Sequence, residues 1–324
     1  YKPVVRYPDN GFVRFAESGQ QFRRPTGVER DPIKSASEYD ADVPPADVEI
    51  TIELAARLVR AQHPDLEAPI ARFARGWDNE VLALGDELLI RMPRRASAAV
   101  LLEHELAWLP TIASMLPLPV PVPLRRGVAG EGYPYPWSIV PRLPGEAVGE
   151  ALLDEQAART LGAFARALHV PAPADAPCNP LRGVALVERA GRFEQGFAAL
   201  GDRIDGRRVR AVFERCVAAP LWDAPRVWLH GDLHPFNVLA AGSRPCAVID
   251  FGDLSAGDPA TDLMIAWMGC DARAREVFLD ETGAEPATIE RGRGWAIALG
   301  CTFAASDDPA LASLGLRAIT AASA

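Results

Sequence analysis

The sequence is poor in cysteine and has no long apolar run. Its five cysteines stand far apart and form no Cys-x-x-Cys pair, which disfavours a zinc ribbon and a disulfide framework. No stretch of 18 uncharged apolar residues is present, so the sequence predicts no membrane-spanning helix. The first residues lack a charged start followed by an apolar core, so we expect no signal peptide. Together these absences predict a cytoplasmic protein.

The chain also lacks an excess of positive charge. Of its 324 residues, 34 are Lys or Arg and 43 are Asp or Glu, which gives a formal net charge of −9. Nucleic acids and anionic membranes prefer basic proteins, so neither is expected as a partner. The acidic balance is compatible with a cationic small molecule. Hydrophobic residues make up 49% of the chain, which is enough for sizeable cores in two domains. The expected oligomeric state is a monomer or a homodimer.

Composition divides the chain into three parts. Residues 1–46 are rich in Arg, Asp, Pro and Ser without a sustained period, which predicts an extended or poorly ordered arm. Residues 47–143 should form a first lobe that ends with a buried strand at 137–140. The segment 141–146 is interpreted as a hinge, and residues 144–324 should form a second, mainly helical lobe. The expected fold class is therefore α+β.

In the first lobe, a helix should begin near Asp47 and strands should occupy 68–92. A hairpin with a two-residue turn beginning at Gly85 is expected there. A helix is expected over about 96–115, and its apolar face includes Glu105, where an unpaired carboxylate would be costly. That face comprises Leu101, Glu105, Trp108, Ile112 and Met115.

In the second lobe, the apolar spacing predicts helices over 157–168 and, with breaks, over 179–217. A hairpin should join 238–239 to 248–249, and the tail from about 271 should again be helical. The sequence thus predicts one prominent β element within a helical lobe.

Two short segments around this hairpin carry the chemistry. Residues 229–237 read Leu-His-Gly-Asp-Leu-His-Pro-Phe-Asn, and residues 248–252 read Val-Ile-Asp-Phe-Gly. Asp232 could receive the proton of a hydroxyl group. Asn237 and Asp250, brought together by the hairpin, offer the hard oxygen ligands that suit Mg²⁺. The joint spacing predicts a phosphoryl-transfer site.

These segments resemble those of the aminoglycoside phosphotransferase family, the small-molecule branch of the protein-kinase-like fold. The resemblance covers roughly residues 50–320 and is most specific over 229–262. It implies a bilobal protein with an N-terminal antiparallel β-sheet lobe carrying a helix and a larger, mainly helical C-terminal lobe. It also implies that Asp232 is the catalytic base and that Asp262 braces the catalytic loop. His230 would be a structural or positioning group.

The resemblance implies further that Asn237 and Asp250 are the magnesium ligands. Arg91 stands where the wider fold places a Lys, and it would hold nucleotide phosphates while pairing with Glu105. Arg always carries its charge and can grip phosphate oxygens with two N–H groups, so we expect it to keep this role.

Four further residues complete the expected nucleotide site. Gly76 and Asn79 belong to a turn in the place of a phosphate-covering loop, where backbone N–H groups can approach phosphate oxygens. Val140 and the residues up to Leu143 would present backbone groups to the purine. The implied cofactors are Mg²⁺ with ATP or GTP, and the sequence does not choose between the two nucleotides.

The expected activity is transfer of the γ-phosphate of ATP or GTP to a hydroxyl group of a small molecule. That molecule would be an antibiotic, such as an aminoglycoside or macrolide, or a metabolite. The alternative is a nucleotide-binding pseudokinase that acts through partner binding. A protein kinase is disfavoured, because no Ala-Pro-Glu element follows the Asp-Phe-Gly sequence. A zinc hydrolase using His230 and His234 is a more distant alternative, because no third His lies near them.

Overall fold

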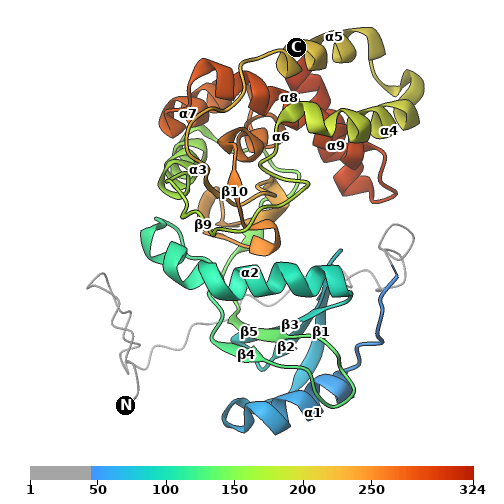
Figure 1. The fold of residues 1–324 in the computed structure, drawn as a ribbon, viewed down its shortest axis with the longest axis vertical. Coiled ribbons are helices and arrows are strands. Elements are labelled where there is room, and N and C mark those ends of the chain that lie inside the picture. The colour runs from blue at the N-terminus through green and yellow to red at the C-terminus, as the bar shows by residue number, and fades with distance from the viewer. Residues whose placement is uncertain (1–44) are drawn as a thin grey trace, which may run out of the picture. The chain divides into compact units, whose positions relative to one another are not determined.

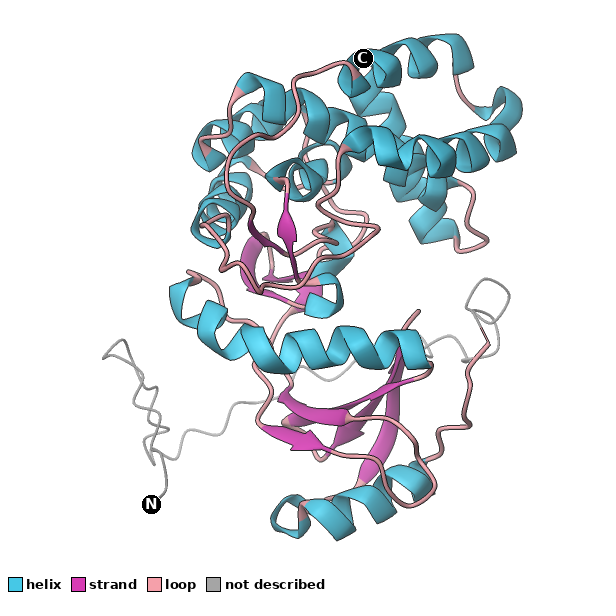
Figure 2. Cartoon of the chain, viewed as in Figure 1, coloured by secondary structure: helices cyan, strands magenta, loops and turns pink. Residues whose placement is uncertain are grey.

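The computed structural model describes residues 45–324, so the predicted arm over 1–46 lies almost wholly outside the described residues. Figure 2 shows the two kinds of structure that the sequence predicts, a group of strands with flanking helices and a larger set of helices. The larger part holds only short strands among its helices. In the described part of the chain, no helix is long and apolar enough to cross a membrane.

The N-terminal lobe is built on an antiparallel sheet in the order β1-β2-β3-β5-β4. In β3 (Leu88–Pro93), Ile90 and Met92 face the cluster of buried apolar side chains that also includes α1 (Ile52–Gln62), whereas Arg91 faces the opposite way, toward α2 (Ala96–Ile112). This alternation follows from the two-residue period of a strand, and Figure 1 shows α1 and α2 on either side of the sheet. The strands are β1 (Ile70–Arg75), β2 (Asn79–Leu84), β3 (Leu88–Pro93), β4 (Arg125–Gly127) and β5 (Trp137–Pro141).

The first helix, α1 (Ile52–Gln62), begins later than predicted. Thr51 caps it, because its side chain accepts a hydrogen bond from the backbone N–H of Leu54. Asp47 instead lies beside the start of the next helix, where its carboxylate accepts from the N–H of Ala96 at 2.9 Å. Asp47 therefore binds the N-terminus of the helix that begins at Ala96, whereas it was expected to lie at the start of α1.

Two predicted details of the N-terminal lobe are wrong. The β2–β3 turn has three residues, 85–87, because Leu84 pairs with Leu88. The buried face of α2 (Ala96–Ile112) is turned by one position, so that Leu102 and Leu109 are buried and Met115 is 44% exposed. Glu105 and Ile112 belong to both the predicted and the observed face. The observed face comprises Ala98, Ala99, Leu102, Glu105, Leu109 and Ile112.

In the C-terminal lobe, most helices pack around the buried helix α8 (Pro286–Ala304), whose Trp295 is fully enclosed, while α3 (Glu155–Leu168) and α7 (Ala272–Thr282) pack against each other. The predicted helix over 157–168 is confirmed. Residues 179–185, in contrast, form a loop, although a helix was predicted to start there. The helices are α3 (Glu155–Leu168), α4 (Ala190–Leu200), α5 (Gly206–Val217), α6 (Ile265–Met268), α7 (Ala272–Thr282), α8 (Pro286–Ala304) and α9 (Pro309–Ser323).

Short strands position the predicted catalytic segments within this lobe. The expected hairpin is present as β8 (Val238–Ala241) and β9 (Arg244–Val248), and β6 (Glu146–Ala147) pairs with its outer edge. The loop of Asp232 follows the strand β7 (Val227–Leu229), as the sequence indicates, whereas the pairing of β7 with β10 (Ser255–Gly257) was not predicted. The loop after β7 carries Asp232, and the residues after β9 carry Asp250, so two β pairs bring these segments together.

Candidate active site

The loop after β7 holds Asp232, and Asp262 braces this loop. The buried carboxylate of Asp262 accepts hydrogen bonds from the backbone N–H groups of His230 and Gly231, both at 2.8 Å. Gly231 has a φ of +84°, and a Cβ built there would lie 2.5 Å from the carbonyl oxygen of Asp253, so this position requires glycine. These contacts fix the backbone just before Asp232 and match the bracing role expected for Asp262.

Both ring nitrogens of His230 are engaged within the protein. Nε2 lies 2.9 Å from the carbonyl oxygen of Ile249, and Nδ1 lies 3.2 Å from the backbone N–H of Asp232. Because a carbonyl only accepts, Nε2 donates and Nδ1 accepts. His230 therefore ties the loop to the residue before Asp250, as a positioning group would. The zinc alternative gains no support, since the described residues contain no group of three or more His, Cys, Asp or Glu side chains that could hold a metal.

The carboxylate of Asp232 lies between two basic side chains. Its Oδ1 is 3.1 Å from Nη2 of Arg182, and its Oδ2 is 3.3 Å from Nε2 of His234. Burial raises the pKa of Asp232, but His234 and Arg182 outweigh burial and hold that pKa well below its usual range. The carboxylate is therefore ionised at neutral pH, which is the state that a proton acceptor needs.

Asn237 and Asp250 flank the β8–β9 hairpin. Nδ2 of Asn237 donates to the backbone oxygen of Asp232 at 2.9 Å and lies 3.3 Å from Nε2 of His234. The amide nitrogen is thus occupied, and Oδ1 is the atom left for a cation. The N–H of Ile249 donates to the backbone oxygen of Asn237 at 2.9 Å, so the hairpin closes beside Asp250 as predicted.

The donor set fits Mg²⁺. An amide oxygen and a carboxylate are hard ligands, and Mg²⁺ is usually held by one or two carboxylates together with substrate phosphates and waters. The side chain of Asp250 is 55% exposed, so its carboxylate is open to a ligand. Asp250 also has a left-handed φ of 63°, a conformation that is uncommon for a residue other than glycine and often found at functional positions. The metal roles of Asn237 and Asp250 stay predictions.

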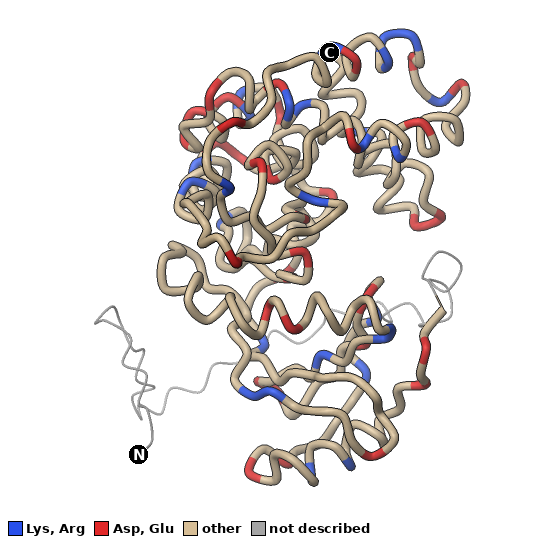
Figure 3. The backbone as a smooth tube through the Cα atoms, in the orientation of Figure 1, with Lys and Arg blue, Asp and Glu red and all other residues tan. Residues whose placement is uncertain are grey.

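Arg91 connects the two lobes. Its Nη1 pairs with Oε1 of the fully buried Glu105, and its Nη2 lies 3.3 Å from Oδ1 of Asp250. Burial alone would lower the pKa of Arg91, but Glu105 and Asp250 raise it above its usual range. The expected contact between Arg91 and Glu105 is therefore present. No lysine follows Lys34 in the sequence, so every blue segment in Figure 3 is arginine.

The turn after β1 is held against the start of α2. The N–H of Gly76 donates to the carbonyl oxygen of Asn79 at 2.9 Å, and the N–H of Arg94 donates to that of Asp78 at 2.8 Å. Nη2 of Arg95 lies 2.6 Å from Oδ1 of Asp78. Oδ1 of Asn79 is buried and has no hydrogen-bond partner among the described residues. The turn is thus well fixed, and contact of Gly76 and Asn79 with a nucleotide stays a prediction.

The last two predicted nucleotide contacts lie at the end of the sheet. Val140 is buried in β5 opposite Leu89 of β3. Leu143 follows this strand and is half-buried. Between them, the N–H of Arg142 donates to the carbonyl oxygen of Glu87 at 2.7 Å. The chain therefore leaves the sheet at the predicted hinge, and the purine contacts of Val140 and Leu143 stay predictions.

Sequence reasoning missed a group of side chains that contacts Asp232. Arg182 reaches Asp232, and the same Nη2 lies 3.3 Å from Oδ2 of Asp253. Nδ2 of Asn179 donates to the other oxygen of Asp253 at 2.6 Å. Asn179 and Arg182 fall in the segment that was predicted to be helical, so their approach to Asp253 was not expected. Gly183, which has a φ of +65°, was a local signal against that helix, because glycine is a poor helix former.

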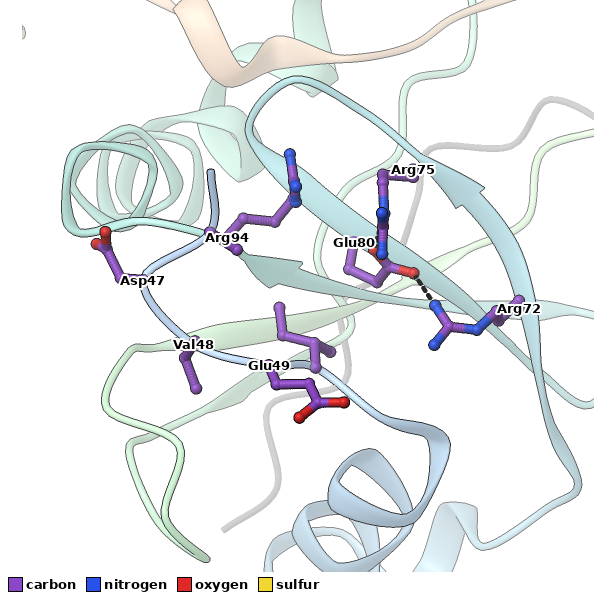
Figure 4. A pocket seen from close by; sticks show the side chains of 9 residues that line it. Asp47, Val48, Glu49, Arg72, Arg75, Glu80 and Arg94 are labelled. Carbon is purple, nitrogen blue, oxygen red and sulfur yellow. Dashed lines mark hydrogen bonds and ion pairs between the residues drawn. The ribbon is translucent and has the colours of Figure 1, made fainter. Parts of the chain in front are cut away.

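A separate cavity of about 340 Å³ lies on the N-terminal lobe, and none of the predicted site residues lines it. Figure 4 shows Glu80 at its wall, where Oε1 lies 2.6 Å from Nη1 of Arg72 and Oε2 lies 3.0 Å from Nε of Arg75. Glu80, Arg72 and Arg75 are thus engaged with one another, and none of the residues that contact Asp232 lines the cavity.

Known proteins resemble this chain in sequence. Residues 69–295 match the model of the phosphotransferase enzyme family known as APH. Streptomycin 6-kinase of Streptomyces glaucescens is 39% identical over 114 residues, which cover 35% of this chain and 34% of that enzyme, so the match spans about a third of the curated relative.

Solved structures share the fold. A GDP complex of aminoglycoside 2'-phosphotransferase-IIIa has a TM-score of 0.61 at 17% identity, covering 83% of this chain and 97% of that one. A macrolide 2'-phosphotransferase from Brachybacterium faecium has a TM-score of 0.55 at 21% identity, covering 78% and 91%. At these identities the likeness concerns the fold alone, and it agrees with the predicted bilobal α+β architecture.

Proposed function

Because this chain belongs to the phosphotransferase enzyme family, we propose that it transfers the γ-phosphate of ATP or GTP to a hydroxyl group of a small molecule, with Mg²⁺. One observation carries the proposal. A continuous set of contacts runs from Glu105 through Arg91 to Asp250, and the hairpin links Asp250 to Asn237 and Asp232. Predicted nucleotide, metal and catalytic residues thus meet at one place.

Asp232 is the proposed proton acceptor. As the acceptor oxygen bonds to the γ-phosphorus, the bond between that phosphorus and the β–γ bridging oxygen breaks. The hydroxyl proton passes to the carboxylate of Asp232, and the nucleoside diphosphate leaves. The low pKa of Asp232 keeps it ionised before the reaction, and its orientation aligns the nucleophile.

The remaining residues bind and neutralise the nucleotide. Asn237 and Asp250 would hold Mg²⁺, which would supply positive charge to neutralise the phosphates of the nucleotide. Arg91 would contact the α- and β-phosphates while Glu105 fixes its guanidinium. The turn from Gly76 to Asn79 would cover the phosphates with its backbone.

The proposed acceptor is an antibiotic hydroxyl, with an aminoglycoside tested first. The sequence match to a streptomycin 6-kinase and the fold shared with aminoglycoside and macrolide phosphotransferases support this order. The net charge of −9 is compatible with a cationic amino sugar. A cytoplasmic location, where ATP and GTP are present, accords with this activity.

A substrate screen tests the proposal. The protein is incubated with Mg²⁺, ATP or GTP, and a panel of aminoglycosides, macrolides and hydroxylated metabolites, and each product is examined for a mass gain of one phosphate. We expect a gain with the wild type and at least a 1,000-fold slower reaction, on the order expected for a lost catalytic base, with Asp232→Asn. A wild type that binds nucleotide but phosphorylates no compound would favour the pseudokinase alternative.

A further inference from the structure

Resting on the proposed function, we propose that Arg182 is a positioning residue that holds the carboxylate of Asp232 in the orientation required to receive the acceptor proton. Arg182 belongs to no recognised motif and lies 50 positions before Asp232 in the chain. It acts through Asp232 and does not itself take part in proton transfer.

The contacts of Asp232 identify what Arg182 adds. The loop backbone is already fixed, because Asp262 accepts from the two N–H groups that precede Asp232. The remaining freedom lies in the side chain, whose rotation moves both oxygens. Arg182 binds Oδ1 and His234 lies next to Oδ2, so the carboxylate is held at both ends. Each oxygen has two lone pairs, so one stays available for a substrate hydroxyl.

The segment that carries Arg182 is itself anchored. The N–H of Gly183 donates to Oγ1 of Thr261 at 3.0 Å, and the carbonyl oxygen of Gly183 accepts from the N–H of Asp258 at 2.9 Å. The carbonyl oxygen of Pro177 accepts from the N–H of Ala256 at 2.8 Å. The segment is thus attached to β10 and to the residues that follow it, and it presents Arg182 from a fixed support.

A second carboxylate limits the movement of the guanidinium. Nη2 of Arg182 lies within 3.3 Å of Asp253 as well as 3.1 Å of Asp232. Asp253 is held in turn by Asn179, whose Nδ2 donates to it at 2.6 Å. The side chain of Arg182 is only 14% exposed, so it has little room to turn toward solvent. Because the two carboxylates share one guanidinium, Arg182 is fixed between them and fixes Asp232 in turn.

Steady-state kinetics with matched variants test this role. Arg182→Gln should lower kcat about 100-fold, because small misplacements of a catalytic group have effects of that order, while KM for nucleotide and acceptor changes less than about threefold. Arg182→Lys should recover part of kcat, and guanidinium ion should raise the kcat of Arg182→Ala several-fold. Unchanged kcat in Arg182→Gln, or a change confined to KM, would overturn the proposal.

Arg226→Gln is the control. Arg226 supports the same region, with Nη1 2.6 Å from Sγ of Cys178 and Nη2 3.1 Å from the carbonyl oxygen of Ala174, but it does not contact Asp232. We expect its kcat to equal that of the wild type. An equal loss of kcat in Arg226→Gln and Arg182→Gln would assign the effect to the general integrity of the segment and overturn the positioning role.

Crystal structures separate this inference from the proposed function. In Arg182→Gln, the Asp232 carboxylate should adopt a different orientation or more than one, whereas the wild type shows a single one with Oδ1 on Arg182. This measurement does not depend on turnover. A wild type without phosphotransfer would refute the proposed function alone, and an unmoved Asp232 in Arg182→Gln would refute the positioning role alone.

Discussion

Arg91 on β3 and Asp250 after β9 are 159 positions apart in the chain, yet Nη2 of Arg91 lies 3.3 Å from Oδ1 of Asp250. The contact joins the sheet of one lobe to the hairpin of the other. It places a predicted phosphate-binding cation beside a predicted metal ligand. In the proposed reaction, Arg91 and Asp250 would exchange this ion pair for contacts with the nucleotide phosphates and Mg²⁺.

Arg91 pairs with Glu105 through its other terminal nitrogen, Nη1. Replacement of Glu105 tests nucleotide binding. Glu105→Gln leaves the guanidinium without its buried carboxylate. We expect nucleotide KM to rise about tenfold, and the free energy of unfolding to fall by about 3 kcal/mol because a buried ion pair is broken. Nucleotide titration and urea unfolding measure the two effects.

Glu103→Gln provides the control on the same helix. Glu103 forms an exposed pair with Arg126, with side chains 39% and 54% accessible, so its loss should change stability by less than about 1 kcal/mol. Nucleotide KM should stay at the wild-type value. If Glu105→Gln behaves like Glu103→Gln in both assays, the role assigned to Glu105 is wrong.

Asp250→Asn tests the metal site while preserving side-chain shape and tolerance of a left-handed φ. Loss of the carboxylate charge should raise the Mg²⁺ concentration needed for half-maximal activity at least about tenfold, since removal of a hard anionic ligand weakens the site. Circular dichroism should be unchanged. Asp86→Asn, on the exposed β2–β3 turn, is the control and should show the wild-type Mg²⁺ dependence. If Asp250→Asn also shows the wild-type Mg²⁺ dependence, the metal role assigned to Asp250 is wrong.

Gly231→Ala and Gly242→Ala separate backbone strain from steric contact. Both glycines have positive φ, but a Cβ at Gly231 would meet Asp253, whereas a Cβ at Gly242 meets nothing within 4 Å. Gly242→Ala should therefore cost about 1 kcal/mol from conformation alone. Gly231→Ala should cost roughly 2 kcal/mol more because of overpacking, and it should abolish most activity. Urea unfolding compares them, and equal losses would refute the proposed contact.

Thiol labelling tests the burial of the cysteines. Burial raises the pKa of the thiols of Cys216, Cys270 and Cys301 to about 12, and the thiolate is the reactive form. At pH 8 these three should react only after unfolding, while the exposed Cys178 reacts first and the half-buried Cys246 follows. Mass spectrometry counts the labels, and more than two labels on the native protein would contradict this packing.

The sequence predicted those elements whose signal is local. The β8–β9 hairpin, with aliphatic strands between Asn237 and Asp250, has such a signal, and so has the apolar stripe of α3. The position of Glu105 was also predictable, because a carboxylate in an apolar stripe needs a partner. The face of α2 was misplaced by one residue, since Leu101 and Leu102 are equally apolar and only packing against the sheet and the second lobe decides between them.

Arg182 was not predictable in the same way. Its partners Asp232 and Asp253 lie 50 and 71 positions away, as the residue numbers show, and nothing next to Arg182 distinguishes it from other arginines. The contact exists because the hydrogen bonds that Gly183 forms, as donor to Thr261 and as acceptor from Asp258, attach its segment to the residues after β10. Such a contact depends on how distant segments of the chain pack together, and local sequence patterns such as hydrophobic periodicity do not reveal this packing.

The absence of lysine after Lys34 has a practical consequence for chemical probing. Amine-reactive reagents modify deprotonated amines such as that of lysine, whereas Arg91, the predicted phosphate-binding residue, has a guanidinium that stays protonated. Residues 45–324 should thus escape such reagents, and amine-directed dyes or surface coupling would attach outside them. A fluorophore or solid support could be added by amine chemistry without modifying any residue of the proposed site.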